Sequence, residues 1–427
     1  MSPKTVLVIG SGGREFAIVW MLLQYLGLIK KIYIAPGNGG TANLSHCENI
    51  NIKPSDKAAL IKFAKDHQVD ITIVGPEDPL GAGLVDDFQV AGLKIFGPTQ
   101  AAAEIELSKV FAKQLMAKYG IPTAPFEVFD DFVAAKRYLH QQTEFPLAMK
   151  ADGGAQGKGA HIVHDLDEAL AMVDKIMVDL IHGDAGKRIV IEKFLIGKEL
   201  SVMIISDGTN YRILPITQDY KYAGEGDTGE MTGGMGTCGP LAWAEELLDD
   251  IRSQIVEPLL NALASEGRPF VGCLYPGLML TEDGLKVLEV NARFGDPEME
   301  SVARLLKTPF LEITAAGIEG HLGDLEIEWS DEYVTSIIIA SAGYPGAYNK
   351  GMVITGLEHA EQIPGVVVMH AGTVLEDSQY KTSGGRVLVV TAIGKNMEEA
   401  LARAKQAAEC IKFEGAWWRH DIGKNAA

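Results

Sequence analysis

Lys4-Thr-Val-Leu-Val-Ile-Gly-Ser-Gly-Gly13 opens the chain with the pattern from which its N-terminal fold follows. Residues 6–9 are an uninterrupted apolar run, which is typical of a strand buried on both faces of a parallel sheet. Glycines follow directly, and apolar side chains then recur at helical spacing from Phe16 to Leu23. The stretch therefore predicts a buried strand, a glycine loop and a helix.

The same pattern recurs downstream. Short apolar runs stand at residues 32–34, 71–74 and 94–96, with helical stretches between them. Strands that alternate with helices predict a doubly wound parallel sheet. A helix is expected over residues 101–119, where a Gly-Ile-Pro breaker ends it, and a smaller α/β unit is expected from residue 126 to about 195.

Three loops follow strands of this sheet, at residues 10–13, 36–41 and 75–80. Ligands of open α/β sheets bind at the carboxyl ends of the strands, so the loops together predict a site, although each alone is more simply a turn. Gly12 and Gly13 are placed to hold a phosphate at the start of a helix. A nicotinamide site is disfavoured, because Glu15 stands where G-x-G-x-x-G needs its third glycine.

Composition limits the class of protein. The chain has 427 residues, enough for several domains, and its net charge of −19 argues against a nucleic-acid surface, which needs clustered Lys and Arg. Its 4 cysteines form no C-x-x-C pair, which indicates a reduced cytosolic compartment. The sequence has no apolar run long enough to span a membrane and no secretory leader, so a cytoplasmic protein is expected.

Residues 151–159, Ala-Asp-Gly-Gly-Ala-Gln-Gly-Lys-Gly, predict a mobile flap over polyphosphate. Glycines let backbone amides approach a phosphate, and lysines neutralise its charge. The segment is not a Walker A loop, because Gly159 takes the Ser or Thr position; a flexible surface hairpin is the alternative. Downstream, Glu192 and Glu199 flank a turn between two strand-like runs, and their spacing alone favours two solvated charges.

Val287-Leu-Glu-Val-Asn-Ala-Arg-Phe-Gly-Asp-Pro-Glu298 is the strongest candidate for a chemical centre. Residues 270–280 and 284–291 are expected to form an antiparallel pair, and strand alternation would put Val287, Glu289 and Asn291 on one face. A carboxylate beside a carboxamide oxygen suits Mg²⁺. A cation there, Arg293, would stabilise a developing negative charge, and a buried edge strand that ends in a solvated turn is the alternative.

The other segments predict less chemistry. Residues 218–239 are expected to form a long structureless loop, and a helix is expected over 245–263. From about residue 329, strands alternate with a helix near 397–411, without a cluster of titratable residues expected to be catalytic. His161 and His164 have no third ligand nearby in the sequence, so a metal role for them is disfavoured.

The chain resembles the phosphoribosylamine–glycine ligase (glycinamide ribonucleotide synthetase) family of the ATP-grasp superfamily. The matching motifs follow the family order over nearly the whole chain; they include Val6-Leu-Val-Ile-Gly-Ser-Gly-Gly-Arg-Glu15, Ala35-Pro-Gly-Asn38, Val74-Gly-Pro-Glu-Asp-Pro79, Lys150-Ala-Asp-Gly153, Thr232-Gly-Gly-Met-Gly236, Arg293-Phe-Gly-Asp-Pro-Glu298, Gly384-Gly-Arg-Val-Leu388 and Arg419-His-Asp-Ile-Gly423.

The resemblance implies an α/β and α+β multidomain fold. Its parts would be a pre-ATP-grasp domain with a doubly wound parallel sheet (residues 1–103), a two-part ATP-grasp unit (104–328) with a mobile flap subdomain at about 126–195, and a small C-terminal α+β domain (329–427). The implied reaction joins glycine to 5-phosphoribosylamine through a glycyl phosphate, giving glycinamide ribonucleotide, ADP and phosphate in de novo purine (IMP) synthesis. ATP and Mg²⁺ or Mn²⁺ are the implied cofactors. Small molecules, not nucleic acid or membrane, are the implied partners of a cytoplasmic monomer or weak homo-oligomer.

The resemblance also implies roles by position. Glu289 and Asn291 match the metal ligands, Arg293 matches a residue that stabilises charge on the acyl phosphate, and Asp219 and Asp296 are candidates for orienting glycine or the amine. The nucleotide-site positions are Lys109, Lys150, Gly157, Lys158, Glu192, Phe194, Leu195 and Glu199, which replaces the reading of Glu192 and Glu199 as solvated charges. The phosphoribosylamine loops would hold Gly12, Gly13, Asn38 and Glu77.

Some positions depart from the family pattern. Phe16 stands where the family commonly has His, and Tyr220 and Tyr222 replace a His and an Arg near the expected acceptor site. An ATP-grasp ligase for another amino acid or amine therefore stays open as an alternative. So does a catalytically inactive nucleotide-binding regulatory protein, although the intact Glu289, Asn291 and Arg293 disfavour it.

Overall fold

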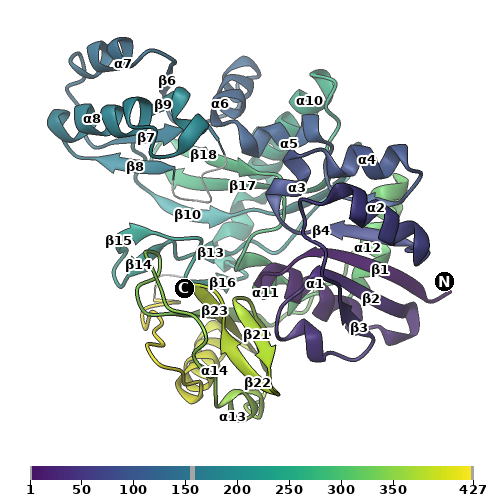
Figure 1. Ribbon diagram of the computed structural model, residues 1–427. Helices are drawn as coiled ribbons and strands as arrows, with labels where there is room; N and C mark the ends of the chain where they lie inside the picture. Colours follow the sequence, from purple (N-terminus) through teal and green to yellow (C-terminus); the bar gives the residue numbers. More distant parts are fainter. Residues whose placement is uncertain (1, 154–158, 425–427) are drawn as a thin grey trace.

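The N-terminal sheet is parallel throughout, as predicted. The structure, a computed structural model, describes residues 2–153 and 159–424. The strand order is β3-β2-β1-β4-β5 (Figure 1). The central β1 carries Val6 to Ile9 at 0% exposure, because neighbouring elements cover both faces of the strand. The strands are β1 Lys4–Gly10, β2 Ile29–Pro36, β3 Cys47–Asn49, β4 Ile71–Val74 and β5 Ile95–Phe96, joined through helices α1 Gly13–Leu23, α2 Lys57–Asp66, α3 Glu77–Gly81 and α4 Leu84–Val90.

The single helix expected over 101–119 was wrong, because the chain breaks at Ser108 into α5 Gln100–Leu107 and α6 Lys109–Lys118. Ser108 has an extended backbone, and its Oγ accepts a hydrogen bond from the amide of Phe111 at 3.0 Å. This is a helix N-cap, which satisfies an amide that the start of α6 would otherwise leave unpaired. The break turns Lys109, the first residue of α6, toward the interior.

Residues 126–193 form a separate small unit, which lies at one end of the molecule in Figure 1. Its antiparallel sheet has the order β6-β9-β7-β8. Its apolar core, which includes Leu139, Met149 and Ile191, is distinct from the two cores of the remaining chain. The elements are β6 Phe126–Phe129, α7 Phe132–Leu139, β7 Leu147–Ala151, β8 Ala160–Val163, α8 Leu166–Val173 and β9 Ile189–Lys193.

A second sheet carries the strand pair expected in the candidate chemical centre. Its order is β10-β17-β11-β12, with β18 beside β17, and the antiparallel pairing of β17 with β18 confirms the prediction. The two glutamates at 192 and 199 lie on different sheets, because β9 pairs with β6 and β7 whereas β10 pairs with β17. The strands are β10 Lys198–Ser201, β11 Ile204–Asp207, β12 Tyr211–Ile213, β17 Val271–Thr281 and β18 Gly284–Asn291.

A bulge in β18 changes which side chains share a face. Leu278 pairs with Val287 and Gly277 pairs with Glu289, so one residue of β18 is left over between them. Val287 is buried in the apolar core, whereas Glu289 and Asn291 line a cavity. The expectation that all three share one face was therefore wrong for Val287.

Residues 218–239 are not a structureless loop. Short strands β13 and β16 join a third sheet, in the order β13-β16-β19-β23-β20, and β14 pairs with β15 as a hairpin. The sheet thus continues from this segment into the C-terminal strands. Its strands are β13 Gln218–Asp219, β16 Gly236–Gly239, β19 Tyr333–Ala340, β20 Val366–His370 and β23 Arg386–Gly394, and the hairpins are β14 Tyr222–Gly224 with β15 Thr228–Met231 and β21 Thr373–Glu376 with β22 Gln379–Thr382.

The remaining helices complete the cores. The expected helix over 245–263 is present as α9 Leu248–Asp250, a π-helical stretch Ile251–Val256 and α10 Glu257–Ser265. The others are α11 Glu298–Ala303, α12 Phe310–Glu319, α13 Leu357–Glu361 and α14 Met397–Cys410. Across the described ranges, 2–153 and 159–424, no helix has the length and apolar character needed to cross a bilayer.

Candidate active site

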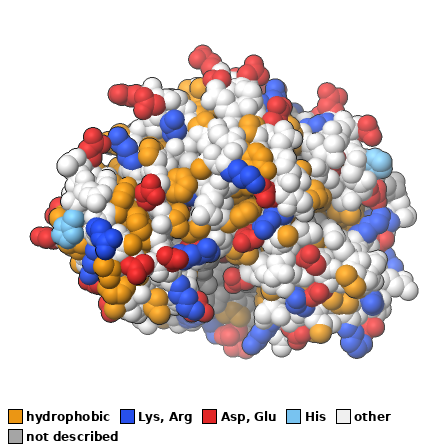
Figure 2. Space-filling model, turned by 90° about the horizontal axis from the view of Figure 1, so that it is seen from above, with side chains coloured by type: hydrophobic (Ala, Val, Ile, Leu, Met, Phe, Trp, Pro, Cys, Tyr) orange, Lys and Arg blue, Asp and Glu red, His pale blue; other side chains and the backbone are white. Residues whose placement is uncertain are grey.

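A cavity of about 750 Å³ brings together segments that are distant in the sequence. The glycine loop contributes Gly12, helix α3 contributes its first residue, Glu77, helices α5 and α6 contribute Glu106 and Lys109, and β18 contributes Glu289. The cavity is therefore at the carboxyl edge of the N-terminal sheet, where the loops were expected to meet. On the outer face seen in Figure 2, acidic and basic side chains are interspersed, so the net charge of −19 does not form one acidic patch there.

Glu289 is the carboxylate around which the cations of the cavity gather. Burial disfavours its charge, but the nearby Lys221, Lys109 and Lys150 outweigh burial and lower the pKa of Glu289 to about 2. Lys221 Nζ is 3.6 Å from Glu289 Oε1 and also pairs with Glu199. Several cations placed together can attract a polyanion, although Lys221 and Lys150 also pair with Glu199 and Glu192.

Asn291 and Arg293 stand beside this carboxylate. Arg293 Nη2 donates to Asn291 Oδ1 at 3.2 Å and lies 3.2 Å from Glu106 Oε1, and Arg293 Nε is 3.6 Å from Glu77 Oε2. Burial opposes the charge of Arg293, but Glu106 and Glu77 raise its pKa above the ordinary value. Arg293 is therefore a fixed cation within the wall, held by the expected loop residue Glu77 on one side and by α5 on the other.

Lys150 and Lys109, both expected at the nucleotide site, have different partners. Lys150 and Lys113 both form ion pairs with Glu192, and Lys150 Nζ also donates to the carbonyl of Leu288 at 3.0 Å. Lys109 Nζ donates to the carbonyl of Gly153 at 3.2 Å, and burial lowers its pKa. Lys109 and Lys150 thus enter the cavity from two sides, next to the start of the undescribed segment 154–158.

The two aspartates expected near the substrates differ in their surroundings. Asp296 Oδ1 is 2.8 Å from Arg386 Nη2, and Asp296 Oδ2 accepts from the amide of Arg14 at 3.4 Å. Asp219 also lines the cavity, but its Oδ1 is buried without a hydrogen-bond partner among the described residues. Asp296 is therefore engaged within the protein, whereas Asp219 has an acceptor left for a ligand.

Several predicted residues lie away from the lining formed by the described residues. Gly13 packs against Glu300, whose Oε1 would be 2.3 Å from a Cβ at Gly13. Asn38 uses its amide within the protein, since its Nδ2 donates to the carbonyl of His370 at 2.8 Å and its Oδ1 accepts from Gly40 and Thr41. The other predicted residues outside the lining are Glu192, Phe194, Leu195 and Glu199, and Gly157 and Lys158 fall outside the described residues.

Sequence reasoning missed other charged residues that line the cavity, among them Glu106, Lys113, Lys221, Glu298 and Arg386. Arg386 comes from β23 and donates to the carbonyl of Asp296 at 2.7 Å. The prediction that the C-terminal part holds no cluster of catalytic residues overlooked this single side chain. Lys221 had a signal, because it lies two residues after Asp219 and side chains two apart share a face of an extended chain.

The residues that depart from the family pattern lie outside the cavity lining formed by the described residues. Phe16 is buried with its ring 5.7 Å from that of His370. The hydroxyl of Tyr220 accepts from the amide of Gly423 at 3.0 Å, and its ring lies 5.4 Å from the guanidinium of Arg419. The backbone carbonyl of Tyr222 accepts from Arg419 at 2.8 Å. Phe16 and Tyr220 thus contact the C-terminal part of the chain, whereas the hydroxyl of Tyr222 is near enough to Glu199 and Lys221 for their charges to shift its pKa.

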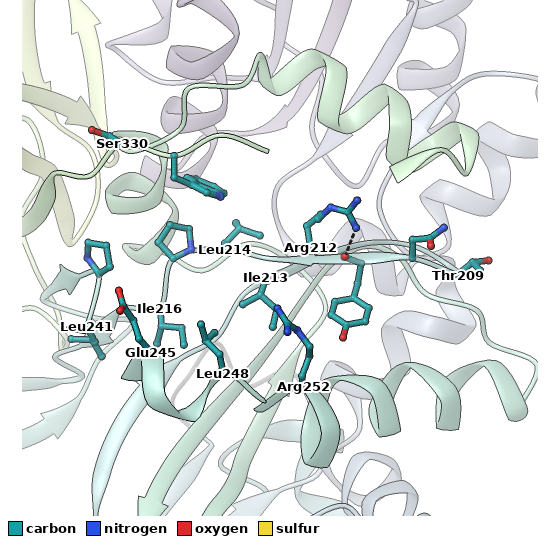
Figure 3. A pocket seen from close by; sticks show the side chains of 15 residues that line it. Thr209, Arg212, Ile213, Leu214, Ile216, Leu241, Glu245, Leu248, Arg252 and Ser330 are labelled. Carbon is teal, nitrogen blue, oxygen red and sulfur yellow. Dashed lines mark hydrogen bonds between the residues drawn. The ribbon is translucent and has the colours of Figure 1, made fainter. Parts of the chain in front are cut away.

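A second cavity, of about 630 Å³, lies beside β12 and is shown in Figure 3. Its wall is mostly apolar, from residues such as Leu214, Ile216 and Leu248. The guanidinium of Arg212 donates to three backbone carbonyls, those of Tyr211, Gly323 and Leu325. Because the Arg212 guanidinium is already satisfied by these carbonyls, this cavity has a weaker basis for reaction chemistry than the first.

The residues at Glu289 and Asn291 fit a divalent cation. They offer an ionised carboxylate oxygen and a carboxamide oxygen from the same strand, the hard donors that Mg²⁺ and Mn²⁺ accept. No group of three or more His, Cys, Asp or Glu side chains within 2–153 and 159–424 is arranged to hold a metal by itself. His161 instead approaches His182, with 2.9 Å between their Nε2 atoms. A metal at Glu289 and Asn291 would thus need ligand or water oxygens to complete its coordination.

Comparisons with known proteins cover nearly the whole chain. Three family models match, described as the N domain (residues 4–106), the ATP-grasp (A) domain (107–299) and the C domain (334–425) of phosphoribosylglycinamide synthetase. A phosphoribosylamine–glycine ligase of Caldanaerobacter subterraneus subsp. tengcongensis is 47% identical over 418 residues, covering 98% of this chain and 99% of that protein.

Solved structures agree. The crystal structure of phosphoribosylamine–glycine ligase from Thermotoga maritima aligns with a TM-score of 0.83 at 33% identity, covering 98% of this chain and 100% of that one. The biotin carboxylase domain of 2-oxoglutarate carboxylase from Hydrogenobacter thermophilus, solved with magnesium ADP, aligns with a TM-score of 0.73 at 16% identity, covering 100% of this chain and 94% of that one. At that identity the second likeness supports the fold alone. The predicted ATP-grasp architecture is confirmed.

Proposed function

The chain belongs to the phosphoribosylglycinamide synthetase family, and we propose how its cavity carries out the family reaction. It is a phosphoribosylamine–glycine ligase, which joins glycine to 5-phosphoribosylamine at the expense of ATP in purine synthesis. The observation that carries the assignment to this cavity is the set of cations around Glu289, with Asn291 and Arg293 beside it. Such a set fits a metal-bound triphosphate next to the carboxylate of the substrate glycine, which must be activated.

Nucleotide binding is assigned to the side of the cavity between α6 and the small unit. Lys109 and Lys150 contact the phosphates, together with Gly157 and Lys158 of the flap. Glu192 faces the adenine, the backbone of Phe194 and Leu195 meets the adenine edge, and Glu199 holds the ribose hydroxyls. The support is that Lys109 and Lys150 line the cavity while Glu192 and Glu199 hold lysines that line it.

Glu289 and Asn291 hold the metal, Mg²⁺ or Mn²⁺. When bound, the ion neutralises phosphate charge and orients the phosphoryl group. The protein side chains contribute by positioning the reactants. Lys109, Lys150 and Lys221 hold the phosphates and the glycine carboxylate next to each other, so the reaction no longer requires an encounter between free molecules.

Arg293 stabilises the charge that develops as the glycine carboxylate takes the phosphoryl group and as the amine then attacks the acyl phosphate. Its pairing with Glu77 and Glu106 fixes the guanidinium before substrates arrive. Asp219 and Asp296 orient glycine or the amine. Gly12 and Glu77 lie directly at the phosphoribosylamine end, whereas Gly13 and Asn38 support the shape of the loops around it.

The same proposal divides the chain into three domains. Residues 1–103 bind phosphoribosylamine, and residues 104–328, which include the flap subdomain at about 126–195, bind ATP. Residues 329–427 close the cavity through Arg386. We place the enzyme in the cytoplasm, as a monomer or weak homo-oligomer. Phe16, Tyr220 and Tyr222 lie outside the lining, which favours glycine over another amino acid despite these exchanges.

Phosphate release from ATP and Mg²⁺ across a panel of amino acids and amines tests the assignment. We expect turnover with glycine plus 5-phosphoribosylamine and little with alanine, serine or other amines. Turnover with another pair, together with none for the expected one, would identify a different ligase. A Lys109→Met variant should raise the KM for ATP, while the exposed Lys62→Met on α2 serves as a matched control.

A further inference from the structure

Two carboxylates at one end of the cavity have no cation partner among the described residues. Asp219, at the end of β13, is 7% exposed, and Glu298, the first residue of α11, is 3% exposed. Both line the cavity. Other carboxylates of the cavity lining do form ion pairs, among them Asp296 with Arg386, Glu106 with Arg293, and Glu15 with Arg14.

The hydrogen bonds of this pair come from neutral groups or are missing. Glu298 Oε1 accepts from the hydroxyl of Tyr275 at 2.5 Å and from Ser201 Oγ at 3.3 Å. Asp219 Oδ1 is buried without a partner among residues 2–153 and 159–424. A buried acceptor without a donor is costly, so a ligand that brings N–H groups and positive charge would be stabilised there.

The two side chains belong to one local arrangement. A Cβ at Gly234 would lie 2.7 Å from Asp219 Oδ1 and 2.5 Å from Cδ of Pro297, the residue before Glu298, so the two segments meet across that glycine. Burial raises the pKa of Asp219 well above its usual value, and the charge of Glu298 raises it further. The two negative charges thus disfavour each other when no ligand stands between them.

We propose that Asp219 and Glu298 together bind the α-ammonium group of the amino-acid substrate, with Tyr275 and Ser201 holding Glu298 in place. The proposal rests on the assigned ligase function. The subsite would fix the orientation of the substrate, because cations lie near the two acids. Lys221 is near enough to couple electrostatically to Asp219, and Arg293 to Glu298. The carboxylate of a two-carbon amino acid would then lie toward these cations and its ammonium group toward the acids.

The acceptor amine fits this subsite less well. The amine of phosphoribosylamine must be uncharged to attack the acyl phosphate, and two carboxylates would stabilise its protonated form. The α-amino group of glycine has the opposite requirement. While it stays protonated it cannot attack the acyl phosphate of a second glycine, so the same carboxylates bind the substrate and suppress a side reaction.

Glycine binding, measured by calorimetry on enzyme saturated with Mg²⁺ and a non-hydrolysable ATP analogue, tests the subsite without turnover. We expect Asp219→Asn and Glu298→Gln each to weaken the Kd of glycine by about 10- to 100-fold, the range for a hydrogen bond to a charged group. The Kd of the ATP analogue should change less than about threefold, since Lys109 and Lys150 are untouched. Glycolate has a hydroxyl in place of the ammonium group, so the two variants should bind it with nearly the same affinity as the wild type.

The matched control is Glu300→Gln. Glu300 is on the same helix, is 0% exposed, has no hydrogen bond to either carboxylate oxygen among the described residues and lies outside the cavity lining. The variant therefore changes a buried carboxyl group on the same helix without touching the subsite, and glycine affinity should stay near that of the wild type. Equal losses in the control and in the two test variants would show a general effect of charge and overturn the proposal.

Other outcomes are equally decisive. Unchanged glycine affinity in both test variants, or a raised KM for phosphoribosylamine with glycine unaffected, would overturn the subsite while leaving the ligase assignment intact. A wild-type enzyme that does not bind glycine at all would overturn the ligase assignment instead. If the two charge variants do not fold, Tyr275→Phe keeps both carboxylates and removes one donor; we expect it to weaken glycine by about 3- to 10-fold, and no change would contradict the proposal.

Discussion

At the scale of single residues, Glu289 has the clearest electrostatic environment. Its pKa of about 2 keeps it ionised at any working pH, and Lys221, Lys109 and Lys150 are the cause. We predict that Glu289→Gln lowers Mg²⁺-dependent phosphate release by about 100-fold or more, because a charged metal ligand is lost. Nucleotide binding without metal should become tighter, since the cations lose their internal partner, and equilibrium dialysis measures this second effect.

The two effects have opposite signs, which separates a metal ligand from a residue that only supports the fold. Glu282→Gln, at the exposed turn between β17 and β18, is the control and should change neither quantity. Weaker metal-free nucleotide binding in Glu289→Gln would contradict the electrostatic account, and unchanged turnover would contradict the metal assignment.

His370 gives a stability prediction that depends on pH. Burial lowers its pKa to about 4, and its ring packs 4.6 Å from that of Tyr380. In the unfolded chain the imidazole of His370 takes up a proton below about pH 6.5, whereas in the folded chain it does so only near pH 4. The neutral imidazole therefore contributes fully to the free energy of unfolding above about pH 6.5, and this contribution is lost as the pH falls toward 4. Its size is about 3 kcal/mol at most.

Urea unfolding at pH 7 and pH 5 measures this contribution. A His370→Gln variant should show a smaller fall in unfolding free energy between the two pH values than the wild type. His359→Gln, on the exposed side of α13, is the control and should keep the wild-type difference. An identical pH dependence in all three proteins would rule out His370 as a source.

At the scale of elements, the cap between α5 and α6 links helix stability to the nucleotide site. Ser108 Oγ caps α6 and donates to Asp152 Oδ1 at 2.9 Å, just before the undescribed segment 154–158. We predict that Ser108→Ala costs about 1 kcal/mol of stability and raises the KM for ATP several-fold, because Lys109 follows the cap. Asn396→Ala, which removes the cap of α14, should cost similar stability with the KM for ATP unchanged. Equal KM values in the two variants would show that the cap has no bearing on ATP.

The same scale shows where sequence reasoning ends. The apolar runs of β1 and β4 and the pair β17–β18 were predictable, because burial and a short turn leave a local pattern. The bulge between Val287 and Glu289 was not, since it depends on how β17 is paired. The strands within 218–239 were also missed, because short strands among glycines have no periodicity, and β16 depends on the distant partner strand β19.

At the scale of the whole molecule, the site was predictable only in part. Glu289, Asn291 and Arg293 are close in the sequence and could be found together. Arg386 and Glu106 could not be placed at the same cavity, because side chains from β23 and α5 meet there only once three sheets are assembled. Asn38 and Gly13 were predicted at the site but do not line the cavity. Asn38 uses its side-chain amide within the protein, and Gly13 packs against Glu300.

The small unit from β6 to β9 is expected to move as one body when nucleotide binds. It has its own sheet and its own core, and its charged contacts with the rest of the chain include Lys113 with Glu192 and the bond from Lys150 to Leu288, both at the cavity. Substrate closure of such a unit excludes water from the phosphates. Crystal structures without nucleotide and with an ATP analogue plus Mg²⁺ should show β6 to β9 displaced together toward β18. The same position of the unit in both structures would contradict this, as would a change confined to the segment 154–158.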